Sequence, residues 1–320
     1  MTIHSSHPQS NNNYLLRCTD KQLDLRCGAM VMGILNTTPD SFYDGGNFVQ
    51  SGKAIDVECA LERALCMVRE GAAIIDVGGE SSRPGAVKIS AEEEIKRTVP
   101  LIAKLRQASD VLISIDTYKA EVAKAALQAG ANIVNDISGF TFDAALPEVC
   151  RRYNAGVVLM QTPVTPQEMQ WSLLTPNSNG NVVAQVRQSL EKSLAVAKRH
   201  GITNIMLDPG FGFGKSVEEN YRLLAHLSLL QNLGYPLLVG LSRKSFLGRL
   251  KVNGEMLIFP AKERFVATIA AQALALQQGA RIIRAHDVAE AVQCLQIVEA
   301  TQAAGAVDYP HDSGFPHSRE

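Results

Sequence analysis

Short apolar runs rich in β-branched residues recur along this chain, and each is followed by a longer stretch with helical periodicity. This alternation is typical of parallel βα units, whose strands are apolar on both faces. Eight such units predict a closed (β/α)8 TIM barrel, because an open doubly wound sheet usually has fewer strands. We expect the strands at about Val31 to Leu35, Ala73 to Val77, Val111 to Ile115, Ile133 to Ile137, Gly156 to Met160, Ile205 to Leu207, Pro236 to Leu241 and Arg281 to Ala285.

The signals between the strands support one barrel domain. The expected helical stretches are Ala54 to Glu70, Ala91 to Gln107, Lys119 to Ala129, Asn181 to His200, Val217 to Leu230 and Lys262 to Gln278. Ser90 and Glu93 fit a capping box, and the glycines expected to end helices are Gly71, Gly130, Gly201 and Gly279. A short hairpin at Leu16 to Leu25 would close the bottom of the barrel. We therefore expect a barrel domain over 14–303, a disordered tail over 1–13 and a flexible tail over 304–320.

Composition limits the kinds of partner. The chain has 46% hydrophobic residues, enough for a sizeable core, and a formal net charge of -1 supplies no overall field for nucleic acid or anionic membrane. Any anion site must therefore be local. The six cysteines form no C-x-x-C pair and are expected to be reduced. The polar amino terminus does not resemble a secretory signal, and no apolar run approaches the roughly 20 residues of a membrane span. We expect a cytoplasmic protein.

Polar residues follow the predicted strands at the end where barrels of this class carry their active sites. They are Asn36, Gly78 to Arg83, Asp116, Asn135, Gln161, Asp208, Ser242 to Lys244, and Arg284 with His286. Any one of them alone is explained equally well as a helix cap or a solvated charge. The convergence of all eight exits on one barrel mouth favours a binding site.

The chemistry of these residues falls into two groups. Local positive charge, which indicates a phosphorylated ligand, comes from Arg83, Lys244, Arg284 and His286. Acceptors and an amide donor, which suit the polar edge of a flat heterocycle, come from Asp116, Asn135 and Asp208. Either a nucleobase or a pterin fits this description.

Three glycine-containing segments need separate interpretation. The stretches 36–46 and 78–85 are longer than ordinary βα turns, and we expect them to act as lids. The segment from Pro209 to Ser216 ends in Gly-Lys-Ser, as a P-loop does, but proline occupies the position where that motif needs its first glycine. We interpret this segment as a turn that lets the backbone approach a flat ligand beside Asp208.

The order of these motifs resembles the dihydropteroate synthase family of pterin-binding barrel enzymes. The resemblance extends from about Val31 to Val298. Its motifs are Met32-Gly-Ile-Leu-Asn-Thr-Thr-Pro-Asp-Ser-Phe42, Asp76-Val-Gly-Gly-Glu-Ser-Ser-Arg-Pro-Gly85, Ser114-Ile-Asp116, Asn135-Asp-Ile137, Leu207-Asp-Pro-Gly-Phe-Gly-Phe-Gly-Lys215, Ser242-Arg-Lys-Ser245 and Arg284-Ala-His-Asp287. Together they imply condensation of 6-hydroxymethyl-7,8-dihydropterin pyrophosphate with p-aminobenzoate, with release of pyrophosphate, and a target for sulfonamides.

The resemblance also implies a role for each residue. The pterin ring would be bound by Asp116, Asn135, Asp208 and Lys244, with Ile137 and Met160 packing nearby. Pyrophosphate would be bound by Asn36, Arg83, Arg284 and His286, with Asn36 also holding Mg²⁺ as the cofactor. The p-aminobenzoate pocket would consist of Phe42, Ser82, Pro84, Phe211 and Ser242, where Ser82 replaces the usual threonine. The catalytic residues would be Asp116, Lys244 and Arg83.

The implied mechanism needs no protein nucleophile. Pyrophosphate leaves first, a carboxylate such as Asp116 stabilises the pterin cation, and the arylamine then adds. One departure from the family affects the fifth strand exit, where His-Met-x-Gly is replaced by Gln161-Thr-Pro-Val164. Two alternatives stay open: a corrinoid-dependent methyltransferase that uses methyltetrahydrofolate, and a non-catalytic pterin-binding paralogue. A homodimer is the expected assembly.

Overall fold

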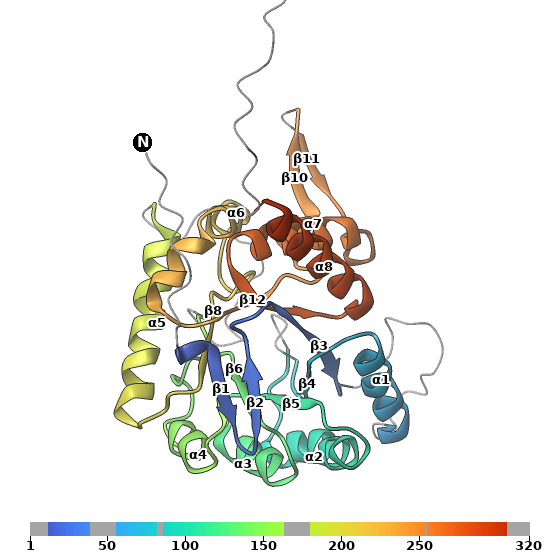
Figure 1. Cartoon of the computed structure of the whole chain (residues 1–320), viewed down its shortest axis with the longest axis vertical. Helices are drawn as coiled ribbons and strands as arrows, with labels where there is room; N and C mark the ends of the chain where they lie inside the picture. The colour runs from blue at the N-terminus through green and yellow to red at the C-terminus, as the bar shows by residue number, and fades with distance from the viewer. Residues whose placement is uncertain (1–11, 39–55, 82–85, 163–179, 254, 306–320) are drawn as a thin grey trace, which may run out of the picture.

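The computed structural model describes residues 12–38, 56–81, 86–162, 180–253 and 255–305. Eight parallel strands close into a barrel in the order β12-β3-β4-β5-β6-β7-β8-β9, and helices surround it (Figure 1). The strands are β3 (Met30–Asn36), β4 (Ile74–Gly78), β5 (Leu112–Asp116), β6 (Ile133–Asp136), β7 (Gly156–Met160), β8 (Ile205–Asp208), β9 (Leu237–Gly240) and β12 (Ala280–Ala285). All eight predicted strands are confirmed, with small shifts at their ends.

Most of the predicted helices are also confirmed. The helices are α1 (Val57–Arg69), α2 (Ala91–Ala108), α3 (Ala120–Gln128), α4 (Leu146–Arg152), α5 (Val182–Arg199), α6 (Val217–Ala225), α7 (Phe265–Gln277) and α8 (Val288–Gly305). The four glycines predicted to end helices have positive φ angles between 69° and 112°. Ser90 caps α2 through Glu93 N, but the Glu93 carboxylate pairs with Arg97, so the predicted capping box is only half formed.

The stretch from Val217 to Leu230, predicted as one helix, is two elements. Helix α6 ends at Ala225, and a 3-10 helix, η3 (Leu227–Leu233), follows it. Leu227, Leu230 and Leu233 lie three residues apart, which matches the 3-10 period, and the first two are fully buried. The apolar spacing therefore satisfies both helix types, and the sequence pattern alone does not separate them.

The amino end of the barrel is closed by the predicted hairpin. Its strands, β1 (Leu15–Cys18) and β2 (Lys21–Asp24), pair in antiparallel register. The hairpin contributes Leu16, Cys18, Leu23 and Leu25 to a buried cluster that also contains Met32, Ile74, Leu112, Ile133, Val158, Met206, Leu238 and Ile282 from the barrel strands. Apolar side chains therefore fill this end and leave the carboxyl end for polar chemistry.

A second hairpin, which we did not predict, follows β9. Its strands, β10 (Arg249–Val252) and β11 (Glu255–Ile258), project from the body of the molecule beside α7 (Figure 1). Asn253 has a φ of 52°, in the left-handed region. The Asn-Gly dipeptide at this position is a strong hairpin signal, so the sequence did carry the information.

The ends of the chain fall mostly outside the described residues. The described chain starts with a short 3-10 helix, η1 (Asn12–Tyr14), and α8 ends at Gly305. The boundaries predicted for the two tails stay predictions. Among the described residues, no helix combines the length and the apolar character that crossing a membrane requires.

Candidate active site

Strand register brings the predicted polar residues together at the carboxyl end of the barrel. Asn36 of β3 pairs with Gly78 of β4, Gly78 pairs with Asp116 of β5, and Asp116 pairs with Asn135 of β6. The missing side chain at Gly78 leaves space there, because a Cβ would lie 3.5 Å from Asn36 Oδ1 and 3.5 Å from Asp116 Cβ. Asn36 and Asp116 therefore border one gap across three neighbouring strands.

Arg284 of β12 joins the carboxylates of two strands. Its Nε donates to Asp76 Oδ2 at 2.6 Å, and its Nη2 donates to Asp116 Oδ2 at 2.7 Å. Asn135 Nδ2 donates to the same Asp76 oxygen at 3.0 Å. Burial alone would lower the pKa of Arg284, but the Asp76 and Asp116 carboxylates outweigh it and raise that pKa. The guanidinium is therefore a fixed positive charge at the mouth.

Asp76 is a site residue that the sequence interpretation missed. It is fully buried in the middle of β4, and among the described residues its Oδ1 has no hydrogen-bond partner. The signal was available, because a carboxylate inside the apolar run Ile74 to Val77 needs a partner. That partner, Arg284, lies 208 residues away in the sequence, so its identity could not be read from a local pattern.

The surroundings of Asp116 shift its pKa. Burial raises the pKa of Asp116 to about 7, Arg284 opposes this, and Asp76 and Glu94 add to it. The alternative role of Asp116 as a helix cap is not supported. Helix α3 starts after Lys119, and the carboxylate that accepts from Ala120 N, at 2.8 Å, belongs to Asp143.

Lys244 and Asp208 form the opposite side of the mouth. Burial lowers the pKa of Lys244 to about 7, and Lys244 Nζ lies 4.1 Å from the centroid of the Phe213 ring. Burial also raises the pKa of Asp208, whose Oδ1 accepts from Gly210 N at 2.7 Å. These two groups influence each other's pKa, and in each case the ionic partner favours the charged form.

The segment after β8 is a backbone turn that is supported by the side chain of Lys215, and it is not a P-loop. Lys215 is buried and donates to Gly210 O at 2.7 Å, to Phe213 O at 3.3 Å and to Gln161 Oε1 at 2.5 Å. Gly210 has a φ of 68°, and a Cβ there would lie 1.9 Å from Gln161 O. The lysine therefore supports the turn beside Asp208, and Gln161 of the altered family motif becomes its acceptor.

An apolar wall flanks these polar groups. Ile137 and Met160, which the resemblance implies lie beside the pterin, form a buried cluster with Tyr118 and Phe213. Phe211 lies elsewhere: it is 1% exposed and stacks on Phe246, with ring centroids 6.2 Å apart. The structure thus places Phe213, which we had not singled out, next to Lys244, and it places Phe211 in the main core.

Two residues assigned to different substrates contact each other. Ser242 Oγ lies 2.9 Å from His286 Nδ1, so the exits of β9 and β12 meet. The residues that the resemblance assigns to the arylamine and to the pyrophosphate are therefore neighbours at these two exits. A small pocket beside Asp116 is lined by Glu80, Ser81, Glu94, Asp116, Thr117, Tyr118 and Ile137. The predicted site residues Phe42, Ser82, Arg83 and Pro84 lie outside the described residues.

Comparison with known proteins agrees with this arrangement. Residues 32–286 match the family described as "Pterin binding enzyme". Dihydropteroate synthase of Synechocystis sp. is 44% identical over 84% of this chain and 89% of its own length, and that of Escherichia coli K12 is 42% identical over 86% and 92%.

Solved structures show the same fold. Yersinia pestis dihydropteroate synthase with a sulfonamide drug complex superposes with a TM-score of 0.80 at 39% identity, covering 90% of this chain and 99% of that one. The Xanthomonas albilineans enzyme in complex with 7,8-dihydropteroate gives 0.76 at 35% identity, covering 92% and 100%. The chain therefore belongs to the pterin-binding enzymes and, within them, to the dihydropteroate synthases.

Proposed function

We propose that the chain condenses 6-hydroxymethyl-7,8-dihydropterin pyrophosphate with p-aminobenzoate to give 7,8-dihydropteroate and pyrophosphate. The observation that carries this proposal is the convergence of Asp116, Asn135, Asp208, Lys244 and Arg284 at one barrel mouth. These groups offer both the polar edge that a pterin ring needs and the positive charge that a leaving pyrophosphate needs. The named relatives support the same reaction.

The residues present suggest how the reaction proceeds. Arg284 and His286 would neutralise the pyrophosphate as its bond to the exocyclic carbon of the pterin breaks. Asp116, ionised beside Arg284, would stabilise the cation that this leaves on the pterin. The arylamine nitrogen then bonds to that carbon and loses a proton. No protein nucleophile takes part.

We further propose that Mg²⁺ assists the reaction. In the described part of the chain, no cluster of three or more His, Cys, Asp or Glu side chains could hold a metal ion by itself. Mg²⁺ does not require such a cluster, because it is often held by few protein oxygens together with substrate phosphates. Asn36 Oδ1, which borders the gap at Gly78, would hold the ion together with pyrophosphate oxygens. When bound, the ion would neutralise charge on the leaving group.

The test is pyrophosphate release from the two substrates with Mg²⁺, with the pteroate product identified by mass. A sulfonamide should compete with p-aminobenzoate. A methyltransferase would instead demethylate methyltetrahydrofolate with a corrinoid acceptor, and a non-catalytic paralogue would bind pterin without releasing pyrophosphate. The ion pairs of Arg284 with Asp76 and Asp116 hold a fixed cation at the site. This cation favours the condensation over methyl transfer, because a methyltransferase has no pyrophosphate to bind.

We also propose that the chain is a homodimer that pairs through α7 and α8. Helix α7 has apolar residues on both its buried and its exposed sides: Ala271 and Ala275 are buried, whereas Val266 and Leu274 are 77% and 52% exposed. Helix α8 packs against it and exposes Ile297 at 65%. Exposed apolar side chains on adjacent helices are typical of an interface. Sedimentation should show a dimer for the wild type and a monomer for Val266→Glu with Leu274→Lys.

We also propose that the protein is cytoplasmic, because its six cysteines are all free. Fractionation of cells that produce the full chain would test this location.

A further inference from the structure

Side chains join the exits of β9 and β12 beyond the ends of the two strands. Residues that pair near the carboxyl ends of these strands are 44 positions apart in the sequence, and so are the members of two side-chain contacts that follow. Ser242 Oγ lies 2.9 Å from His286 Nδ1, and Arg243 Nη2 donates to Asp287 Oδ1 at 2.8 Å. These contacts therefore continue the strand register past the residues that pair through their backbones.

Arg243 occupies a backbone position that normally favours glycine. Lys244 N donates to Leu241 O at 3.2 Å, which closes a four-residue turn with Arg243 at its third position. Arg243 has a φ of 56°, in the left-handed region, where a long side chain is disfavoured. A glycine would fit this turn without strain, so the strain at Arg243 indicates a function for its side chain.

Contacts to two helices hold this turn. Arg243 N donates to Thr268 Oγ1 at 3.1 Å, and Arg243 O accepts from Arg264 Nη1 at 3.1 Å. The guanidinium also donates from Nε to Asp287 Oδ2 at 3.4 Å, so it contacts both oxygens of this carboxylate. The backbone of the turn is thus attached to the start of α7, and its side chain is attached to the start of α8.

Asp287 directs its carboxylate to this turn and not to its own helix. Asp287 O accepts from Ala291 N, and an aspartate at such a helix start usually caps the amides of the first turn with its side chain. In the described part of the chain, the Asp287 carboxylate accepts from Arg243 alone. The side chains of Arg243 and Asp287 are 31% and 23% exposed, so their ion pair adds little to stability. Its main effect is therefore on geometry.

The turn sets the direction of two residues of the candidate active site. Ser242 precedes Arg243 and contacts His286, whereas Lys244 follows it and lies 4.1 Å from the centroid of the Phe213 ring. The backbone dihedrals of Arg243 determine how its two neighbours are oriented relative to each other. The left-handed turn therefore lets one side chain reach the exit of β12 while the other reaches the opposite side of the mouth.

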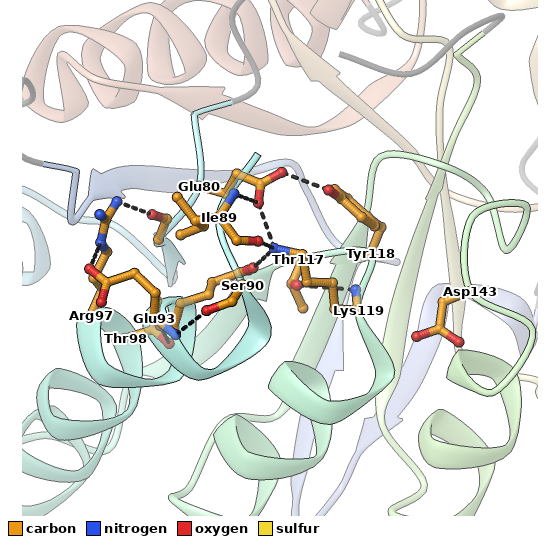
Figure 2. A network of polar contacts seen from close by, with 12 residues as sticks. Glu80, Ile89, Ser90, Glu93, Arg97, Thr98, Thr117, Tyr118, Lys119 and Asp143 are labelled. Atoms are coloured by element: carbon orange, nitrogen blue, oxygen red, sulfur yellow. Dashed lines mark hydrogen bonds and ion pairs between the residues drawn. The ribbon is translucent and has the colours of Figure 1, made fainter. Parts of the chain in front are cut away.

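A different connection joins the exits of β4 and β5. Lys119 Nζ donates to Glu80 Oε2 at 2.5 Å and to Glu94 Oε2 at 2.6 Å, which links these exits to α2 (Figure 2). The resemblance assigns none of these three residues to a substrate, whereas it assigns both neighbours of Arg243 to one. Of the two connections, the one between β9 and β12 therefore acts directly on assigned site residues.

We propose that Arg243 and Asp287 are positioning residues, which hold the turn after β9 so that Ser242 stays on His286 while Lys244 points into the barrel mouth. The inference rests on the proposed function, because it concerns residues assigned to that reaction. Both substrates should be affected, since Lys244 is assigned to the pterin, and Ser242 and His286 to the arylamine and the pyrophosphate.

The experiment compares Arg243→Gly with Asn154→Gly in the full-length protein. Asn154 has a φ of 48° and precedes β7 at the amino end of the barrel, so it is a matched control for glycine at a left-handed position. In Arg243→Gly we expect kcat/KM for both substrates to fall about tenfold. The urea midpoint should change little, because relief of strain offsets the loss of a partly exposed ion pair. Asn154→Gly should keep the wild-type kcat/KM.

A signal from His286 tests the geometry without turnover. The ring nitrogens of ¹⁵N-labelled His286, assigned with the help of His286→Gln, should shift in Arg243→Gly because Ser242 no longer stays within hydrogen-bonding distance. Asn154→Gly should leave them unchanged. Wild-type turnover tests the proposed function by itself. If the wild type were inactive, the His286 signal would still decide whether Arg243 positions the turn.

A double-mutant cycle tests whether Arg243 and Asp287 act as one unit. Asp287→Ala should also lower kcat/KM about tenfold, and its combination with Arg243→Gly should again cost about tenfold and not about a hundredfold. Asp287→Asn keeps one acceptor for Arg243 and should cost only about threefold.

Two results would overturn the inference. One is an Arg243→Gly protein that matches wild type in kcat/KM and in the His286 signal, and the other is a double variant in which the two losses multiply. Asp287→Ala leaves the turn residue in place, so it decides the question if Arg243→Gly fails to fold. Wild-type turnover and an unshifted His286 signal in Asp287→Ala would then exclude a positioning role.

Discussion

The two ends of the barrel are lined by the same strands, yet their inward-facing side chains differ in kind. At the amino end, Ile74, Leu112, Met206 and Ile282 contact the β1–β2 hairpin in a buried apolar cluster. Two residues further along each of these strands, the inward positions hold Asp76, Ser114, Asp208 and Arg284. The change from apolar to polar takes place within one step of the strand period.

This difference separates the residues that stabilise the fold from those that carry the chemistry. The apolar end gains free energy from burial and needs no particular charge. The polar end contains buried carboxylates and cations whose pKa values are displaced, and Asp76 Oδ1 and Ser114 Oγ have no hydrogen-bond partner among the described residues. Such groups reduce stability and are typical of sites that bind a ligand. Substitutions at the two ends should therefore have opposite consequences.

The largest effect on activity is expected for Asp116→Asn. A neutral amide cannot balance a cationic intermediate, so turnover should fall by about two to three orders of magnitude. Stability should not fall with it and should rise near neutral pH, because Arg284 keeps its bond to Asp76 and the variant buries no ionised carboxylate at this position. Steady-state pyrophosphate release and urea unfolding of the same preparation measure the two quantities. Near-normal turnover would remove Asp116 from the mechanism and weaken the contrast between the ends.

Leu23→Ala is the matching change at the other end. Leu23 is 1% exposed in the hairpin cluster, and its truncation should lower the free energy of unfolding by about 2–5 kcal/mol. Turnover measured well below the melting temperature should stay within about twofold of wild type. Chemical denaturation and the pyrophosphate assay are the two measurements. A large loss of turnover in the folded variant would show that the hairpin influences the site across the barrel.

Stability should also depend on pH through Asp116 at the polar end. The pKa of Asp116 is raised by burial to about 7 in the folded protein, compared with 3.8 for the ordinary group. The folded protein therefore binds the extra proton between these values. The free energy of unfolding loses this contribution as the pH rises from about 4 to about 7, by at most ~1.4 kcal/mol per pH unit.

Asp116→Asn supplies the control for this dependence, because it cannot titrate. Asp136, whose pKa burial raises to about 6, is present in both proteins, so its contribution cancels in the difference. Urea unfolding at a series of pH values from 4 to 8 should show the wild type losing stability relative to the variant as the pH rises. Parallel curves would mean that Asp116 titrates normally, and that the polar end is less desolvated than its geometry indicates.

The fold was predictable because it rests on local patterns. Apolar strand runs, helix periodicity and helix-ending glycines such as Gly71 each act within a few residues, and together they specify eight βα units. The failures were also local. The leucines of η3 satisfy two helix types at once, and the Asn-Gly signal of the Asn253 hairpin was overlooked in the connection after β9.

The site was predictable only in part, since its contacts join distant segments. The sequence pattern located the carboxyl ends of the strands, so it could place Asp116, Asn135 and Asp208 at the same end of the barrel, as the strand register shows. The pairing of Arg284 with Asp76 and of Lys119 with Glu80 did not, because no local spacing relates these residues. Chemical type was therefore readable from sequence, whereas the choice of partner needed the three-dimensional structure.

The smallest effect on ligand binding is expected for Gln161→Leu. Gln161 lies at the polar end of the barrel, but we expect it to stabilise the turn after β8 and to take no part in the reaction. Gln161 Oε1 accepts from Lys215, which still has two carbonyl acceptors in the variant. Loss of one bond to a charged donor should cost about 1.5–3 kcal/mol of stability. The pterin Kd should rise only a few-fold, because the turn beside Asp208 keeps its other supports.

The matched variant for this change is Gln161→His, which restores the family's residue type at the exit of β7. A histidine ring nitrogen can accept from Lys215 only when it is neutral, so recovery of stability should be greater at pH 8 than at pH 6. Urea unfolding and pterin binding at both pH values provide the comparison. If Gln161→Leu abolishes turnover while pterin still binds, the Gln161–Lys215 pair is needed for the reaction itself. The residues required for catalysis would then include side chains that support the turn after β8, in addition to those at the strand exits.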